Sequence, residues 1–224
     1  MDYSDILGTV IGHLEGLGIE CTATAGEDVG EAELASAEAT MGVQLPAELR
    51  EFYQAFGDGV GVFWRSDPDD FGKPWGSLNV PTLASLAEMY HGWRGLVLYT
   101  PEQAEKYGFP YTDDPALAKR TAARMWHWLP IIDEPNGDAI CLDLGAPGCP
   151  VVFNRHDWMD GGTGDDGHIL APSWRAFLMA WGSVCYQDPV HWTDCLRQGG
   201  GVDWSCKRFD RSLHVAGLMK CDER

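Results

Sequence analysis

Acidic side chains that surround tryptophans are the feature of this sequence with the clearest chemistry. One group lies within residues 64–75, and a second surrounds a tryptophan in the glycine-rich stretch of residues 157–167. Surface carboxylates steer a basic partner, and tryptophans that become desolvated at an interface supply much of the binding energy. The sequence therefore predicts a protein-binding surface. Its candidate residues are Asp58, Trp64, Asp67, Asp69, Asp70, Trp75, Asp157, Trp158, Asp160, Asp165 and Asp166.

Adjacent carboxylates allow a second chemistry, which is acid and base catalysis on a glycan with tryptophans as sugar platforms. A retaining glycosidase needs two carboxyl groups about 5 Å apart, and an inverting one needs about 6.5–9.5 Å. Spacing along a chain does not fix those distances, so a carbohydrate-active or glycan-binding protein stays as an alternative. The pairs are Asp69-Asp70, Asp113-Asp114, Asp133-Glu134 and Asp165-Asp166.

Metal and nucleotide sites are not indicated. His191, Cys195 and Cys206 lack a fourth ligand at the spacing of a zinc site, and residues 160–167 do not fit the calcium-loop pattern. The glycines are not part of a phosphate-binding motif. Seven cysteines and seven histidines will supply some Cys-His pair by chance, so no nucleophile stands out. We expect no metal and no cofactor.

The charge balance limits the partners. The 224 residues contain 16 Lys and Arg against 34 Asp and Glu, a formal net charge of −18. This charge repels phosphate backbones and anionic lipids, which argues against nucleic-acid or membrane binding and favours a basic partner. No apolar stretch reaches membrane-spanning length, and the opening residues lack the basic region of a secretory signal. The cysteines contain no C-x-x-C pair and suit a reducing cytoplasm.

The elements that must position these residues begin with helices. The apolar spacing predicts helices over residues 4–17, 31–41 and 45–56, with Ser4 as the first cap. A strand over 60–64 then leads into a loop over 65–76. Capping boxes predict further helices near residues 85 and 100, and an acidic cap before proline predicts one over 114–126.

The second half of the chain changes character. Short β-rich runs at residues 129–132, 139–144 and 150–153, separated by turn sequences, predict an antiparallel meander, and Ser173 caps a closing helix. Helices, then a meander, then a helix indicate an α+β fold. We assign one domain to residues 1–198 and a C-terminal extension to 199–224. The extension carries a net charge of +1 and either folds back on the acidic body or stays flexible, with a strand expected over 202–209.

Three stretches carry a family resemblance. They are Glu38 with residues 41–53 (MGVQLPAELREFY), residues 129–131 with 136–143 (LPI and NGDAICLD), and residues 151–157 with 173–178 (VVFNRHD and SWRAFL). Together they resemble the SUKH superfamily of fungal cell-wall-assembly regulators and bacterial toxin-immunity proteins. The resemblance covers about residues 30–182, with an insertion over about 82–127. It implies a mixed, largely antiparallel sheet flanked by helices, no cofactor, no catalytic residues and a protein-binding role.

The sequence and the resemblance together favour a non-enzymatic, cytoplasmic immunity protein. We expect it to neutralise a cognate toxin, such as a nuclease, by covering a basic active cleft with an acidic surface. A regulatory scaffold is a further alternative that differs only in its partner. Nothing in the sequence fixes the oligomeric state.

Overall fold

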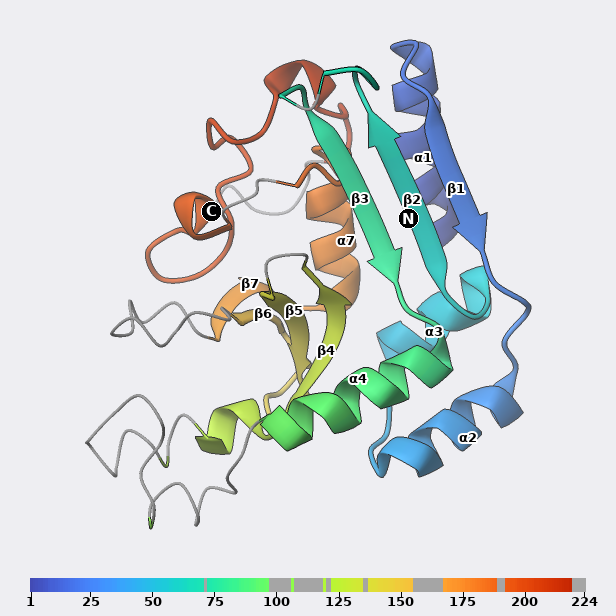
Figure 1. Cartoon of the computed structure of the whole chain (residues 1–224), viewed down its shortest axis with the longest axis vertical. Coiled ribbons are helices and arrows are strands. Elements are labelled where there is room, and N and C mark those ends of the chain that lie inside the picture. The colour runs from blue at the N-terminus through green and yellow to red at the C-terminus, as the bar shows by residue number, and fades with distance from the viewer. Residues whose placement is uncertain are drawn as a thin grey trace.

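The computed structural model of the chain contains two antiparallel sheets and the helices that pack on them (Figure 1). It describes residues 1–70, 72–96, 106, 119, 122–134, 137–154, 167–188 and 192–218. The helices described over their full length are α1 (Tyr3–Gly16), α2 (Glu31–Met41), α3 (Ala47–Phe56), α4 (Leu83–Leu96) and α7 (Trp174–Gly182), with short 3-10 turns at Trp192–Cys195 and Arg211–Leu213. The strands are β1 (Cys21–Ala25), β2 (Val60–Arg65), β3 (Trp75–Val80), β4 (Trp128–Asp133), β5 (Ala139–Asp143), β6 (Val151–Asn154) and β7 (His168–Ala171). The predicted α+β class is confirmed.

The N-terminal sheet has the order β1-β2-β3, and α1 packs against one of its faces (Figure 1). Side chains alternate between faces along a strand, so Val60, Val62 and Trp64 of β2 are buried on the α1 side, while Phe63 is 43% exposed on the other. The predicted strand over 60–64 is confirmed. The loop predicted over 65–76 is shorter than expected because β3 begins at Trp75, and β1 was not predicted.

The second sheet has the order β4-β5-β6-β7, and its first three strands are the predicted meander. These strands are buried along almost their whole length, because helices and the N-terminal half of the chain cover both faces. Near-continuous apolar sequence is what such strands require. The fourth strand, β7, was not predicted.

Helix boundaries differ from the predictions in detail. The first helix starts earlier than expected, because Asp2 rather than Ser4 caps it and its carboxylate accepts from the Asp5 N–H at 2.7 Å. Helix α4 confirms the helix predicted near residue 85, with Thr82 Oγ1 accepting from the Ser85 N–H at 3.1 Å. The helices predicted near 100 and over 114–126 fall mostly outside the described residues.

The C-terminal segment packs against α7. The described part of the extension, residues 199–218, carries apolar side chains that belong to the main core, so it folds back on the body. The prediction of a strand over 202–209 is wrong, since this stretch forms turns with one isolated bridge between Leu196 and Val202. Aromatic contacts fix the segment in place. They join Phe177 and Trp181 of α7 to Trp192, and Trp192 and Phe209 to Trp204.

Candidate functional site

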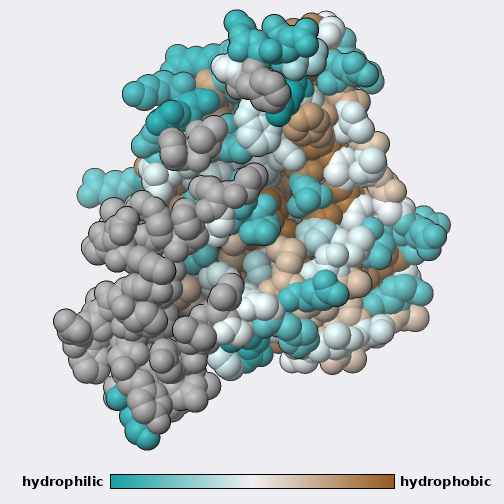
Figure 2. Space-filling model, in the orientation of Figure 1, coloured by the Kyte–Doolittle hydropathy of each residue, from teal (hydrophilic) through white to brown (hydrophobic). Residues whose placement is uncertain are grey.

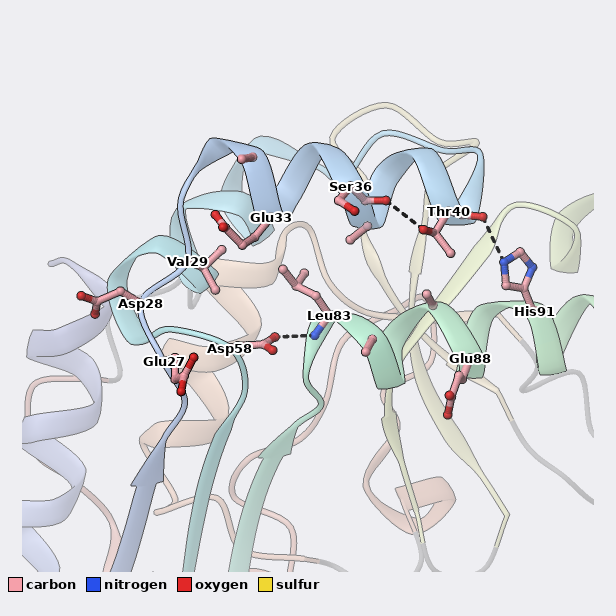
Figure 3. A pocket seen from close by; sticks show the side chains of 14 residues that line it. Glu27, Asp28, Val29, Glu33, Ser36, Thr40, Asp58, Leu83, Glu88 and His91 are labelled. Atoms are coloured by element: carbon pink, nitrogen blue, oxygen red, sulfur yellow. Dashed lines mark hydrogen bonds between the residues drawn. The ribbon is translucent and has the colours of Figure 1, made fainter.

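A groove of about 660 Å³ lies between helices α2 and α4. Small side chains line its floor, so the helices leave open space between them where larger residues would fill it. Acidic side chains and His91 lie around this floor, as Figure 3 shows. The lining residues are Glu27, Asp28, Val29, Ala32, Glu33, Ser36, Ala37, Thr40, Asp58, Leu83, Ala84, Ala87, Glu88 and His91.

One carboxylate ties the three segments of the groove together. Asp58 Oδ1 accepts the N–H of Leu83, the first residue of α4, at 2.6 Å, and the Asp58 N–H donates to the Glu27 carbonyl at 2.8 Å (Figure 3). A negative charge at a helix N-terminus also interacts favourably with the helix dipole. Gly26 is needed beside this turn, because a Cβ at that position would overlap the Asp58 backbone. Asp58 therefore has a structural role in shaping the groove.

The opposite end of the groove is fixed by a side chain from α4. A ring nitrogen of His91 lies 3.1 Å from the Thr40 carbonyl oxygen near the end of α2 (Figure 3). Gly42 then ends α2 in the left-handed conformation, with φ of 71°, which glycine adopts without steric strain. The two helices are thus linked at both ends of the groove.

The ionised side chains that line the groove are all carboxylates among the described residues. Its lining contains five carboxylates, on Glu27, Asp28, Glu33, Asp58 and Glu88, and no lysine or arginine among the described residues. Four of them, on Glu27, Asp28, Glu33 and Glu88, belong to exposed side chains. Like charges gathered along a concave surface attract cations more strongly than the same charges spread apart. The arrangement suits a lysine- or arginine-bearing surface.

The acidic loop between β2 and β3 lies at the other end of the sheet. Asp67 Oδ1 accepts from the Asp69 N–H at 3.0 Å, and Asp70 Oδ1 accepts from the Gly72 N–H at 2.9 Å, so two carboxylates order the loop itself. Trp75 is half-buried, with its ring 6.4 Å from that of Phe63. The six residues of β2, roughly 17 Å of strand, separate this loop from Asp58. The predicted residues that the structure describes therefore lie at two ends of the sheet and do not form one surface.

Trp64 is a correction to the predicted site. Its side chain is 1% exposed, and its Nε1 donates to the Cys185 carbonyl at 2.7 Å within the core. It is therefore not available to a partner, because the alternation of β2 places it on the buried face with Val62. The remaining predicted residues, Asp157, Trp158, Asp160, Asp165 and Asp166, lie outside the described residues.

Sequence reasoning missed most of the groove. The Ala- and Glu-rich run of residues 31–41 was recognised as a helix, but its small residues at helical spacing were not recognised as one wall of a groove. The signal was that four of its eleven residues are alanine and only three side chains are buried. Such a helix makes a narrow contact with the body and leaves much of its surface open.

A strongly perturbed carboxyl lies in the second sheet rather than in the groove. Burial and, to a smaller extent, the neighbouring Asp188 carboxylate raise the pKa of Glu134 to about 8. Within the described ranges, no cluster of three or more His, Cys, Asp or Glu side chains is suited to hold a metal ion. None of the helices in that same part of the chain combines the length and apolarity that crossing a membrane requires.

A comparison with family models finds one match. The model of the SMI1 / KNR4 family (SUKH-1) matches residues 28–180, which is more than half of the chain. This confirms the resemblance predicted from the sequence. The match covers both walls of the groove and ends within α7, whereas α1, β1 and the C-terminal segment lie outside it. No curated protein matches the chain.

Proposed function

Because the chain belongs to the SMI1/KNR4 (SUKH-1) family, which includes immunity proteins, we propose that it neutralises a cognate toxin by stoichiometric, non-catalytic binding in the cytoplasm. The groove between α2 and α4 is the docking surface in this proposal. The observation that carries it is the set of five carboxylates without a lysine or arginine in the groove lining. A nuclease cleft, whose positive charge holds phosphates, is the complementary surface.

Occlusion is the mechanism that this groove supports. The exposed carboxylates of Glu27, Asp28 and Glu88 attract the basic cleft and raise the association rate. Lysine or arginine side chains of the toxin then enter the space above the alanine floor, where each forms charge-assisted hydrogen bonds with the rim. A toxin held in this way cannot admit its substrate.

The acidic β2–β3 loop is a second proposed contact. We keep the partner-binding role that the sequence predicts for Asp67, Asp69, Asp70 and Trp75. The side chains of Asp69 and Asp70 are exposed. Because the loop and the groove lie at opposite ends of β2, a toxin that reaches both must extend along the N-terminal sheet.

Co-expression tests the proposed function. The first candidate partner to test is the product of the reading frame next to this gene, produced in a host whose growth it stops. We expect growth to be restored only when this chain is produced in at least equal amount, and a 1:1 complex whose association rate falls steeply with added salt. Rescue by far less than one equivalent contradicts occlusion, and a complex formed equally fast at low and high salt contradicts the electrostatic mechanism.

A matched pair of charge reversals locates the docking surface. Glu88→Lys on the groove and Asp69→Lys on the β2–β3 loop change the net charge by the same amount, and both side chains are exposed. We expect Glu88→Lys to lower the association rate at low salt by about tenfold and Asp69→Lys to lower it much less. Equal effects of the two variants would show that the overall charge, and not the groove, steers the toxin.

A further inference from the structure

The strand β1 forms an open edge of the N-terminal sheet. It is last in the order β1-β2-β3, and among the described strands it pairs only with β2. Four of its five residues, Thr22 to Ala25, are exposed. Figure 1 shows β1 at the outer margin of the molecule with α1 behind the sheet, and Figure 2 shows apolar surface over the front of that sheet. An open edge of this kind is a template for another strand.

Two other sheet edges, at β3 and β7, hydrogen-bond with further backbone of the chain itself. Ser77 on β3 donates its N–H to the Tyr186 carbonyl at 3.0 Å, and the Asp188 N–H donates to the Trp75 carbonyl at 3.3 Å. On β7, the Ile169 carbonyl accepts from the N–H of Gly201 at 2.6 Å. The described part of the chain therefore covers β3 and β7 with backbone, whereas it pairs β1 with β2 alone.

The composition of β1 does not protect its edge. Its sequence, CTATA, contains neither the charged residue nor the proline that commonly blocks edge pairing. The N–H of Gly26 donates to Gly59 of the β2 side at 2.9 Å, and hydrogen-bonding direction alternates along an antiparallel strand. The backbone groups of Thr22 and Thr24 therefore point toward β2, and those of Ala23 and Ala25 point outward.

Charge selects the kind of strand that fits. The open strand runs directly into Glu27 and Asp28, two exposed residues of the acidic groove. Pairing with a second copy would bring together two chains that each carry a net charge of −18. A strand from a basic partner faces no such repulsion, and its lysine or arginine side chains would meet the carboxylates at the end of β1.

We propose that β1 pairs with a β-strand of a basic protein partner, which extends the N-terminal sheet to four strands and places basic residues of that strand beside Glu27 and Asp28. The inference rests on the proposed function, since it names how the toxin is held. It also goes beyond the family match, because β1 precedes the matched residues 28–180. Backbone pairing supplies affinity, and the flanking charges supply selectivity.

A peptide titration tests the edge directly. The probe is an acetylated, amidated peptide of alternating threonine and valine with a lysine at each end, and the control peptide carries glutamates in place of the lysines. With ¹⁵N-labelled full chain, we expect the lysine peptide to shift and protect the amides of Ala23 and Ala25. The proposal is overturned if these amides do not respond, if both peptides bind equally well, or if the free chain dimerises through β1.

Two variants at position 23 distinguish the contribution of the backbone N–H to peptide binding from the contribution of the side chain. Ala23→Pro removes the outward N–H, whereas Ala23→Ser keeps it. We expect Ala23→Pro to weaken peptide binding by about tenfold and Ala23→Ser to leave it within about twofold. Ala25→Pro makes the equivalent change if Ala23→Pro lowers the melting temperature. Equal binding by a folded proline variant and the wild type overturns the proposal.

Hydrogen exchange in the toxin complex distinguishes this proposal from the proposed function. If the chain restores growth while Ala23 and Ala25 exchange in the complex as fast as in the free chain, the toxin docks elsewhere and the edge inference fails alone. If the chain does not restore growth, the immunity function fails, and the peptide titration still decides whether the edge binds a basic strand.

Discussion

The two edges of the N-terminal sheet differ in what covers them. The edge at β3 is covered by residues 186–188, which return from beyond α7 and hydrogen-bond with Trp75 and Ser77. The edge at β1 carries exposed residues and pairs with β2 alone among the described strands. An edge close to the core is thus covered by distant sequence, whereas the edge at the margin has no strand partner besides β2 in the described part of the chain.

Covering the β3 edge requires an unusual backbone. Cys185 and Tyr186 both adopt the left-handed region, with φ of 58° and 53°, although neither is glycine. Such residues are held there at a cost of about 1 kcal/mol or more each, which surrounding contacts must offset. Trp64 supplies one of these contacts through its hydrogen bond to the Cys185 carbonyl. The covered edge therefore depends on packing in a way that the open edge does not.

The largest expected effect comes from the tryptophan under the covered edge. Trp64→Ala leaves a cavity and an unpaired Cys185 carbonyl, so we expect the free energy of unfolding to fall by about 3–5 kcal/mol in urea titrations. Trp75→Ala is the control, because its side chain on the same sheet is only half-buried. A loss no larger than that of the control would show that Trp64 does not hold the edge together.

A smaller effect is expected where the covering segment passes closest to β3. A Cβ at Gly76 would lie 2.5 Å from Trp64 Nε1 and 2.6 Å from the Tyr186 carbonyl oxygen, so Gly76→Ala forces the segment away. We expect a loss of about 1–3 kcal/mol in the free energy of unfolding. Ala23→Val adds two methyl groups to the open edge, and we expect no measurable loss there. Equal losses would remove the distinction between the edges.

Local pattern was sufficient to predict the elements that bury a clear face. The first helix and the meander over 129–153 were predicted because their apolar residues recur at the spacing of helices and strands. The alternation of Val60, Val62 and Trp64 along the predicted strand is a signal for a buried tryptophan that the prediction of a binding surface did not use. A partner for Trp64 at Cys185 could not be predicted, since it lies 121 residues away.

Long-range contacts also explain why the groove and the open edge were missed. The groove exists because the bond from Leu83 to Asp58 places α4 beside α2, and no short motif encodes that juxtaposition. The sequence of β1 is short and weakly apolar, so it becomes a strand only through pairing with β2. An acidic surface was predicted, but the position of the acidic groove depends on these tertiary contacts.

A pH-dependent effect concerns the Glu134 carboxyl, which lies beside the covering segment. Burial and the adjacent Asp188 raise the folded-state pKa of Glu134 from the ordinary 4.5 to about 8. A raised pKa favours the protonated form in the folded chain, so the stability that Glu134 contributes is fully present below pH 4.5 and is lost as the pH rises through 8. Glu134→Gln removes this titration. We therefore expect the variant's melting temperature, relative to the wild type, to rise between pH 5 and pH 9. If that difference stays flat over this range, the region around the covered edge does not hold Glu134 in a desolvated site, and the contrast between the edges is one of pairing alone.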